Sequence, residues 1–315
     1  MDFNQSNLDI LFRTVSTNYQ SAFDLTPTVS EKIASTFPMA TATVNFAFLN
    51  RIPKLRKWVG DRVVNSAYTQ VRNVTSAPYE DTVSLDKFDF EDDQFSVFNY
   101  ALTSLAQQSK KWPDDLVFDY ILNRASTENG FDGVPLYSTS HPVQGAGITV
   151  PGQTAVQSNL FVSTALNFDN YGSVRAKMSS LVGVDGHPLA VTPNLLVVPP
   201  QLEQTARLIL TADFLPSTAG TASQSNIWKG SAELLVIPEL ASYPQNWWLM
   251  DTTKAVKPFV FHQRKAPVMT ALTSPTDANV FMSRQLIWGV EARGIATESL
   301  WFLSAAATGE AQYVA

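Results

Sequence analysis

The side chains that could act as a nucleophile or as a general base are few and dispersed. The chain has three histidines, His141, His187 and His262, and none stands at the spacing of a zinc-binding or catalytic pair. Ser138 and Ser140 come just before His141, but a nucleophile and its base are normally brought together by the fold, not by adjacency in sequence. We therefore predict that the histidines are structural or exposed and that the chain has no catalytic residue.

Sequence motifs for cofactors are also missing. There is no Gly-x-Ser-x-Gly elbow and no glycine-rich phosphate loop, and Gly145-Ala146-Gly147 lacks the third glycine of a dinucleotide site. The chain has no cysteine, which removes disulfides, thiolate metal sites and cysteine nucleophiles together. We predict no bound cofactor and no metal, and we predict that the protein is not an enzyme.

Five carboxylates between residues 86 and 93 form the densest acidic cluster: Asp86, Asp89, Glu91, Asp92 and Asp93. Such a group could bind a divalent cation, but it has neither the spacing nor the glycine turn of a calcium loop. Acidic residues are also favoured in the first turn of a helix, where the helix dipole stabilises them. The start of a helix is the favoured interpretation.

The composition indicates an extensively covered surface. Of 315 residues, 45% are hydrophobic and only 16% are charged, against about 25% charged in ordinary soluble domains. Contact with neighbouring subunits would deplete charge in this way, although sampling variation gives the same figure. The net charge of −6 argues against a sequence-specific nucleic-acid binder, since the main basic cluster is only Lys54, Arg56, Lys57 and Arg62. No signal peptide and no membrane-spanning run is visible.

The first 90 residues read as extensions from a body rather than as a core. Leu8, Ile10, Leu11 and Val15 could form one face of a short helix in a weakly organised arm, for which disorder is an equal alternative. Residues 63 to 90 are β-like and mostly polar, with a turn-rich stretch at 73–79 between two strand signals at 68–71 and 81–85. They predict a two-stranded ribbon that projects from the body, because an isolated hairpin is marginal without a partner.

A long helical stretch and a mixed body follow. Apolar residues recur at helical spacing over residues 91–129 and predict two helices end to end or one helix kinked at Pro113. A further helix begins near Asn167, and another spans about 201–210. Buried strands are predicted where apolar residues run together, at 195–198, 232–238, 247–251, 259–261, 287–294 and 299–302. Helices and strands alternate irregularly, so the predicted fold class is α+β.

Several short blocks, taken in order, give the chain its resemblance to a known family. They cover about residues 50 to 265, with a looser match beyond, and none is decisive alone. The blocks are Ile52 to Arg62, Phe90 to Asp93, Asp132-Gly133 with His141-Pro142, Leu196 to Pro200, Trp247 to Asp251 and Lys257 to Arg264. The sequence resembles the Mu-like bacteriophage major head (capsid) subunit family, whose members have the HK97-type capsid fold.

The resemblance implies a structural protein of the virion, assembled in the host bacterial cytoplasm. It implies self-assembly into hexamers and pentamers of an icosahedral shell around double-stranded DNA, with scaffold and portal proteins as assembly partners and no membrane. The fold it implies has an N-terminal arm (1–43), an extended β-ribbon or E-loop (44–90), a peripheral domain with a long spine helix (91–189), an axial domain (190–255), and C-terminal strands returning to the peripheral domain (256–315).

The residues expected to contact other subunits are in the ribbon region and the basic segment leading to Trp58. They are Lys54, Arg56, Lys57, Trp58, Arg62, Tyr68 and Tyr79. Three other functions stay open at this point: an encapsulin-like compartment with the same fold but no DNA, a hydrolase with dispersed catalytic residues, and a secreted or tail-associated adhesin. An adhesin would carry more β-repeats and glycine-rich turns, and no internal repeat is found.

Overall fold

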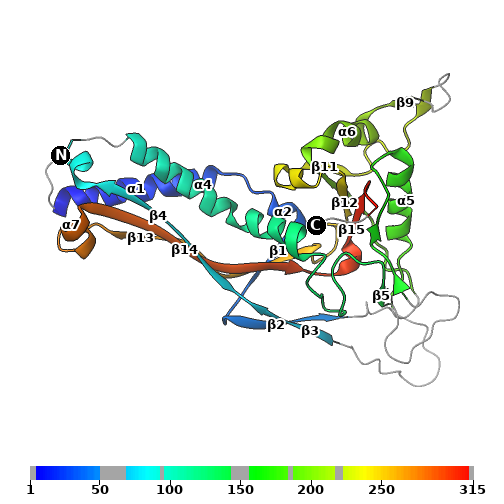
Figure 1. Cartoon of the computed structure of the whole chain (residues 1–315), viewed down its shortest axis with the longest axis horizontal. Coiled ribbons are helices and arrows are strands. Elements are labelled where there is room, and N and C mark those ends of the chain that lie inside the picture. The colour runs from blue at the N-terminus through cyan, green and yellow to red at the C-terminus, as the bar shows by residue number, and fades with distance from the viewer. Residues whose placement is uncertain are drawn as a thin grey trace.

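The computed structural model describes residues 5–49, 69–92, 96–142, 156–183, 187–216 and 223–311. The molecule is elongated in Figure 1, with a long helix-and-sheet layer on one side and a more compact body on the other. Helices and strands are mixed within both parts, as expected for the α+β class and the HK97-type capsid fold.

The long layer is a four-stranded sheet with two helices along it (Figure 1). The strand order is β1 (Ala34–Pro38), β13 (Phe259–Leu272), β14 (Gln285–Glu298) and β4 (Ala77–Asp86). Strands β1 and β13 are parallel, whereas the other two pairs are antiparallel. The helices are α1 (Gln5–Leu25) and α4 (Ser96–Asp119). The N-terminal segment is therefore ordered as a helix, and the alternative of a disordered arm is wrong for residues 5–25.

Helix α1 forms because its apolar side chains find a partner. Leu8, Val15 and Tyr19 repeat at helical spacing and are buried together with Leu102 of α4 and Trp288 of β14. Each buried aliphatic or aromatic side chain contributes about 1.5–3 kcal/mol relative to its exposed state. The predicted face was right at Leu8 and Val15. Ile10, on the opposite side of the helix, is half exposed.

Helix α4 is continuous through Pro113, so the single-helix alternative is the correct one. It ends in a π-helical turn, η1 (Tyr120–Arg124). The acids after Pro113 do not start a second helix. The Asp114 carboxylate instead accepts hydrogen bonds from the backbone N–H groups of Val29 (2.9 Å) and Ser30 (2.8 Å), which begin the short helix α2 (Ser30–Ile33). Asp114 thus stabilises the start of another helix.

The compact body contains a five-stranded sheet. Its order is β11 (Glu233–Val236), β8 (Leu195–Val198), β12 (Asn246–Met250), β15 (Ser304–Thr308) and β7 (Leu160–Phe161). Helices α5 (Phe168–Ser179) and α6 (Glu203–Thr211) belong to this body (Figure 1). The predicted strands at 195–198, 232–238 and 247–251 are confirmed, as is the start of α5, where the Asn167 side chain accepts from the N–H of Asn170 at 2.8 Å.

The central strands of this sheet are buried on both faces. Every residue of β8, β12 and β15 is buried. One face, with Val197 and Trp248, belongs to a core shared with the end of α4, and the other face, with Leu196 and Trp247, packs with α5 and α6. Two-sided burial explains why these strands are continuous apolar runs rather than alternating ones.

The ribbon differs from its prediction in which strands pair. Strand β2 (Thr43–Leu49) pairs antiparallel with β3 (Thr69–Thr75), and both project beneath the layer in Figure 1. The predicted hairpin turn at 73–79 is wrong, because the chain stays extended from β3 into β4 with only Ser76 between them. The predicted partner at 81–85 belongs to β4, which pairs with β14.

Two further predictions are corrected. Residues 299–302 are no strand: the Ser299 hydroxyl donates to the Lys257 carbonyl at 2.6 Å and accepts from the Leu300 N–H, and such local bonds compete with a sheet ladder. The predicted loop at 212–226 contains a short pair of antiparallel strands, β9 (Phe214–Pro216) and β10 (Ser223–Ser225).

The remaining elements are short. They are α3 (Lys87–Glu91), β5 (His141–Pro142), β6 (Val156–Gln157), η2 (Pro200–Leu202), η3 (Pro238–Ser242), α7 (Ala278–Ser283) and η4 (Trp301–Leu303).

The five-segment division predicted from the sequence stays a prediction. Strands β13 and β14 run along the layer that carries α4, while the last strand, β15, joins the compact body beside β12. The C-terminal segment therefore contributes to both parts of the molecule.

Candidate functional site

Six of the seven predicted contact residues lie outside the described part of the chain: Lys54, Arg56, Lys57, Trp58, Arg62 and Tyr68. The seventh, Tyr79, belongs to β4 of the long layer and not to the ribbon. Its side chain is 37% exposed, and its ring packs against Trp112 of α4 with 5.5 Å between the centroids. The structure thus places Tyr79 in the long layer and not in the ribbon.

A buried charge on the ribbon, that of Arg72, contacts the rest of the chain. Arg72 of β3 donates to the Glu128 carboxylate (Nη2 to Oε2, 2.8 Å), and its Nη1 is paired with Glu298 Oε2. Tyr120, in the π-helical turn after α4, donates its hydroxyl to the same Glu298 oxygen. The Glu298 side chain is only 1% exposed and ends β14. We refer to Arg72, Tyr120, Glu128 and Glu298 as the ribbon-base cluster.

The electrostatics of the cluster follow from its burial. Burial opposes the charge of Arg72, but the adjacent Glu298 and Tyr120 outweigh it, so the pKa of Arg72 is raised. Burial, together with the Glu298 charge, also raises the pKa of Tyr120 well above its ordinary value. The second oxygen of Glu298, Oε1, is buried without a hydrogen-bond partner among the described residues. The pair is therefore held by few, strong contacts, and loss of one partner would leave a buried charge.

Arg124 extends this arrangement on the side of α4. Its guanidinium lies 4.9 Å from the Tyr120 ring centroid and donates to the Ala296 carbonyl at 3.0 Å. It is also 3.7 Å from the Glu128 carboxylate, so two arginines share that acid. The ribbon, the end of the long helix and the end of β14 are thereby tied at one point.

The pKa of His262 is affected by the Arg72 charge of the same cluster. It is buried on β13, and its Nε2 lies 3.0 Å from the Thr297 hydroxyl. Burial and the nearby Arg72 charge lower the pKa of His262 to about 4. The ring is therefore neutral at neutral pH, which suits a buried position beside a cation.

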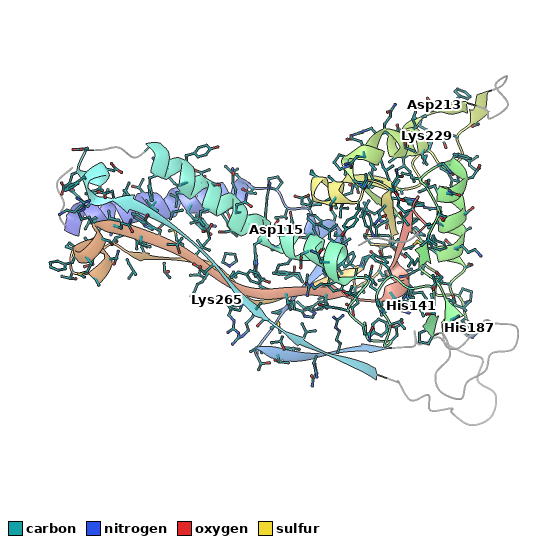
Figure 2. All side chains as sticks on the ribbon, viewed as in Figure 1. Asp115, His141, His187, Asp213, Lys229 and Lys265 are labelled. Carbon is teal, nitrogen blue, oxygen red and sulfur yellow. The ribbon has the colours of Figure 1, made fainter. Side chains whose placement is uncertain are left out.

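His141 is the side chain that most resembles a catalytic base, and its surroundings rule out that use. Its Nδ1 lies 2.6 Å from Asp132 Oδ2, and its Nε2 lies 3.0 Å from both the Leu136 carbonyl and Asn159 Oδ1. The ring is fully buried and stacks on Trp301, with 4.2 Å between centroids. Both ring nitrogens face acceptors, and no substrate could reach them. Figure 2 labels His141 in the lower part of the compact body, and its burial and contacts indicate a structural role.

The acidic cluster is also structural where it is described. Asp86 accepts from the Phe88 N–H at 2.8 Å and so caps α3, a short helix that was not predicted separately from α4. Among the described residues, no group of three His, Asp or Glu side chains could hold a metal ion. None of the helices within the described ranges is both long and apolar enough to cross a membrane.

The ribbon-base cluster was missed from the sequence. Arg72 is the one charged residue in β3, and Glu298 is the last residue of a strand that is otherwise mostly uncharged. A lone charge in a strand of low charge is the signal that could have marked each residue. Their pairing could not be read, because it depends on how two distant segments pack.

Comparison with known proteins gives a consistent result. The family model for the Mu-like prophage major head subunit gpT matches residues 8–165, 151–240 and 241–313. The major capsid protein of Escherichia phage Mu is 20% identical over 293 residues, covering 93% of this chain and 70% of that protein. The Mu-like prophage FluMu major head subunit of Haemophilus influenzae is 21% identical over 300 residues, covering 95% and 72%.

The solved structures agree in fold. A chain of the procapsid of bacteriophage JBD30 superposes with a TM-score of 0.61 at 21% identity, over 97% of this chain and 76% of that one. A chain from Microbacterium phage Oxtober96 gives a TM-score of 0.51 at 14% identity, over 89% and 90%.

Proposed function

Because this chain belongs to the Mu-like prophage major head subunit gpT family, we propose that it assembles through its ribbon into the hexamers and pentamers of an icosahedral phage head. The family's role is structural: the chain is a major capsid protein of the tailed-phage type, a component of the virion, and not an enzyme. Assembly into a shell is the shared property of this fold in phage capsids. The capsomer geometry and the contacts are the proposal.

The observation that carries the proposal is the ribbon. Strands β2 and β3 project from the layer in Figure 1, and the side chain of Arg72 in β3 contacts the rest of the chain through the ribbon-base cluster. A two-stranded ribbon is marginal in water unless it packs on another surface. In a shell that surface is a neighbouring subunit, and a ribbon fixed at its base by a buried ion pair would present its far end at a defined angle.

The contact residues proposed for this far end are those predicted from the sequence. Lys54, Arg56, Lys57 and Arg62 form the main basic cluster of an acidic chain, and Trp58 lies among them. Aromatic and arginine side chains are enriched at the centres of protein interfaces. Tyr68 and Tyr79 complete the proposed set, with Tyr79 acting from the long layer rather than from the ribbon.

Further partners belong to the same proposal. Packaged double-stranded DNA would be contacted without sequence specificity, since the net charge of −6 provides no strong basic surface. Scaffold and portal proteins would act during assembly in the host bacterial cytoplasm. The alternative function is a compartment of the same fold that encloses protein instead of DNA. The two are distinguished by the contents of the particles, because phage heads from cells expressing all the head genes would contain nuclease-resistant DNA.

The test is a charge reversal in the basic segment, Arg56→Glu with Lys57→Glu. We expect the variant to fold, with an unchanged circular dichroism spectrum, and to lose most particle formation in negative-stain electron microscopy. The reason is that the altered charges would repel the surface that the ribbon contacts in another copy, while neither residue belongs to a described core.

The matched control is Lys177→Glu with Lys229→Glu, which makes the same change of charge on α5 and on the surface beside α6. The Lys229 side chain is 51% exposed, and its ion pair with Asp213 is a surface pair of little energetic value. This control should assemble normally. Normal particles from the Arg56/Lys57 variant would contradict the proposed contact, and a wild-type chain that stays monomeric at high concentration would contradict shell assembly itself.

A further inference from the structure

The chain contains a single Asn-Gly pair, Asn129-Gly130, in the turn that follows η1. Asparagine is most readily deamidated in this dipeptide, because glycine has no side chain to hinder the approach of its backbone nitrogen to the asparagine amide. Asn129 is exposed to solvent, so water has access to it. The pair therefore has the chemistry of a spontaneous modification site.

The reaction consumes only water. The backbone nitrogen of Gly130 attacks Cγ of the Asn129 side chain and gives up its proton, and ammonia leaves as a cyclic succinimide closes. A water molecule then opens the ring at either of its two carbonyl groups. One opening gives aspartate. The other gives isoaspartate, in which the main chain runs through the former side chain and is longer by a carbon atom.

The folded turn withholds the nitrogen that would attack. The Gly130 N–H donates to the Val134 carbonyl at 2.7 Å, and Asn129 forms a β-bridge with Pro135. The turn is closed at its far end by Gly133, whose N–H donates to the Gly130 carbonyl at 3.2 Å and whose φ of 85° suits glycine. The nitrogen becomes available only when this turn opens locally.

Two side-chain contacts hold the turn, one to the body and one to the ribbon. On the body side, Asp132 Oδ2 lies 2.6 Å from Nδ1 of the buried His141. On the ribbon side, Glu128, which precedes Asn129, accepts from Arg72 of β3 at 2.8 Å. The Glu128 side chain is 39% exposed, whereas that of His141 is fully buried. The ribbon contact is therefore the one that opens more easily.

Gly130 also adjoins the buried acid of the ribbon-base cluster. A Cβ atom added at Gly130 would lie 3.2 Å from Glu298 Oε1, so the backbone of the turn lies close to this carboxylate. Glu298 is in turn paired with Arg72. A longer main chain at position 129 would shift Glu128 relative to Gly130, and it would thereby disturb both contacts of the turn with the cluster.

We propose that Asn129-Gly130 is a site of spontaneous deamidation whose rate is controlled by the ribbon-base cluster. While Arg72 binds Glu128, the turn stays closed and Asn129 is preserved. When the ribbon leaves its base, the turn opens more often, and Asn129 is converted to aspartate and isoaspartate. The isoaspartate form no longer fits the cluster, so the detachment of the ribbon becomes permanent. The proposal rests on the geometry of the ribbon base and does not depend on shell assembly.

The test measures the conversion of Asn129 in the unassembled full-length chain at mildly alkaline pH. Tryptic peptides are analysed by mass spectrometry, and isoaspartate is detected by enzymatic methylation with isoaspartyl methyltransferase. The wild-type chain in guanidinium chloride gives the rate for the open turn. We expect the folded wild-type chain to react slower by about tenfold or more, and folded Arg72→Met to react about tenfold faster than folded wild type, because the reaction proceeds through the locally open turn.

Two controls separate local opening from other effects. Lys32→Met removes a cation from an exposed ion pair with Glu233, away from the turn. Val198→Ala weakens the core on the side of α5 and α6. Both should convert Asn129 at close to the wild-type rate. If Arg72→Met reacts no faster than these two variants, control by the cluster is wrong. Equal rates in folded and unfolded wild type, or no reaction in either, would overturn the modification site.

The last step is tested on the product itself. The isoaspartate form of the wild-type chain is separated by ion exchange and subjected to limited proteolysis beside the unreacted form. We expect faster cleavage near β3 in the isoaspartate form, since the ribbon has lost its fixed base. Equal cleavage of the two forms would contradict the permanent detachment of the ribbon.

Discussion

The ribbon base and the five-stranded sheet of the body are stabilised by opposite means. The sheet is apolar on both faces, and every residue of β8, β12 and β15 is buried. The ribbon is joined to the body through Arg72 and its acidic partners, a contact made by charge and hydrogen bonds. The free energy gained by apolar burial depends on the area buried and not on the direction of a contact. A buried ion pair depends on the relative orientation of its two groups and is costly to break.

This difference fits the two tasks of a shell subunit. The body must stay folded in every position of the shell, and a large apolar core provides that stability. The ribbon must be held in a given direction relative to the body, and a directional contact provides that control. The comparison predicts that a core variant lowers the stability of the whole chain, and that a cluster variant also changes where the ribbon points.

The largest expected effect is in the sheet. Trp248 of β12 is fully buried against the central core, and Trp248→Ala would leave a large cavity there. We expect a loss of about 3–5 kcal/mol in the free energy of unfolding, measured by urea denaturation of the unassembled chain. Tyr100→Ala is the control, because this α4 side chain is 81% exposed and its removal should change stability by about 0.5 kcal/mol or less. Equal losses in the two variants would contradict the apolar account of the body.

A smaller effect is expected at the ribbon base. Glu298→Gln keeps the shape of the side chain but leaves Arg72 without its most buried partner. Removal of one partner of a buried pair costs about 3–5 kcal/mol, and the remaining Glu128 contact should reduce this to about 2–3 kcal/mol. Urea denaturation gives the stability, and limited proteolysis of the ribbon strands gives their attachment to the body.

The double variant Arg72→Met with Glu298→Met separates stability from direction. Replacing both charges with apolar groups can be neutral for stability. The buried Tyr120 hydroxyl loses its acceptor in this variant, so we expect the free energy of unfolding to recover only in part. Attachment of the ribbon should not recover, and proteolytic cleavage near β3 should stay faster than in the wild-type chain. Recovery of both properties would show that the ion pair has no directional role.

The same contrast explains what the sequence could predict. The strands at Leu195–Val198 and Asn246–Met250 were found because two-sided burial makes them continuous apolar runs. The long helix was found because its apolar residues recur every three or four positions. For these elements, the arrangement of apolar residues that stabilises the fold can be seen directly in the sequence.

The ribbon and its base could not be predicted in this way. Strand β3 is mostly polar and shows no regular apolar alternation, so nothing in its sequence favours β2 over β4 as its partner. The contact of Arg72 with Glu298 depends on the packing of distant segments. Tyr79 illustrates the consequence, because its assignment to the ribbon followed from the wrong strand pairing, and its position beside Trp112 emerged only from the fold.

The smallest expected effect tests the charge of Arg72 through pH. Because the pKa of His262 is lowered from 6.5 to about 4 in the folded chain, the unfolded chain binds a proton more readily. The stability contributed by the neutral ring is therefore complete above about pH 6.5 and is lost as the pH falls toward 4. Between pH 7 and pH 5 the loss should be about 2 kcal/mol, measured by urea denaturation over that range.

The control for this pH effect is His262→Gln, which can still bond to the Thr297 hydroxyl but does not titrate. The variant should lose less stability than the wild-type chain over this range, and the difference isolates His262 from the carboxylates that titrate at lower pH. Arg72→Met in the wild-type background should raise the pKa of His262, because one cause of its lowering is the Arg72 charge. If neither variant changed the pH dependence of stability, the protonation of His262 and its coupling to the Arg72 charge would not contribute to that dependence.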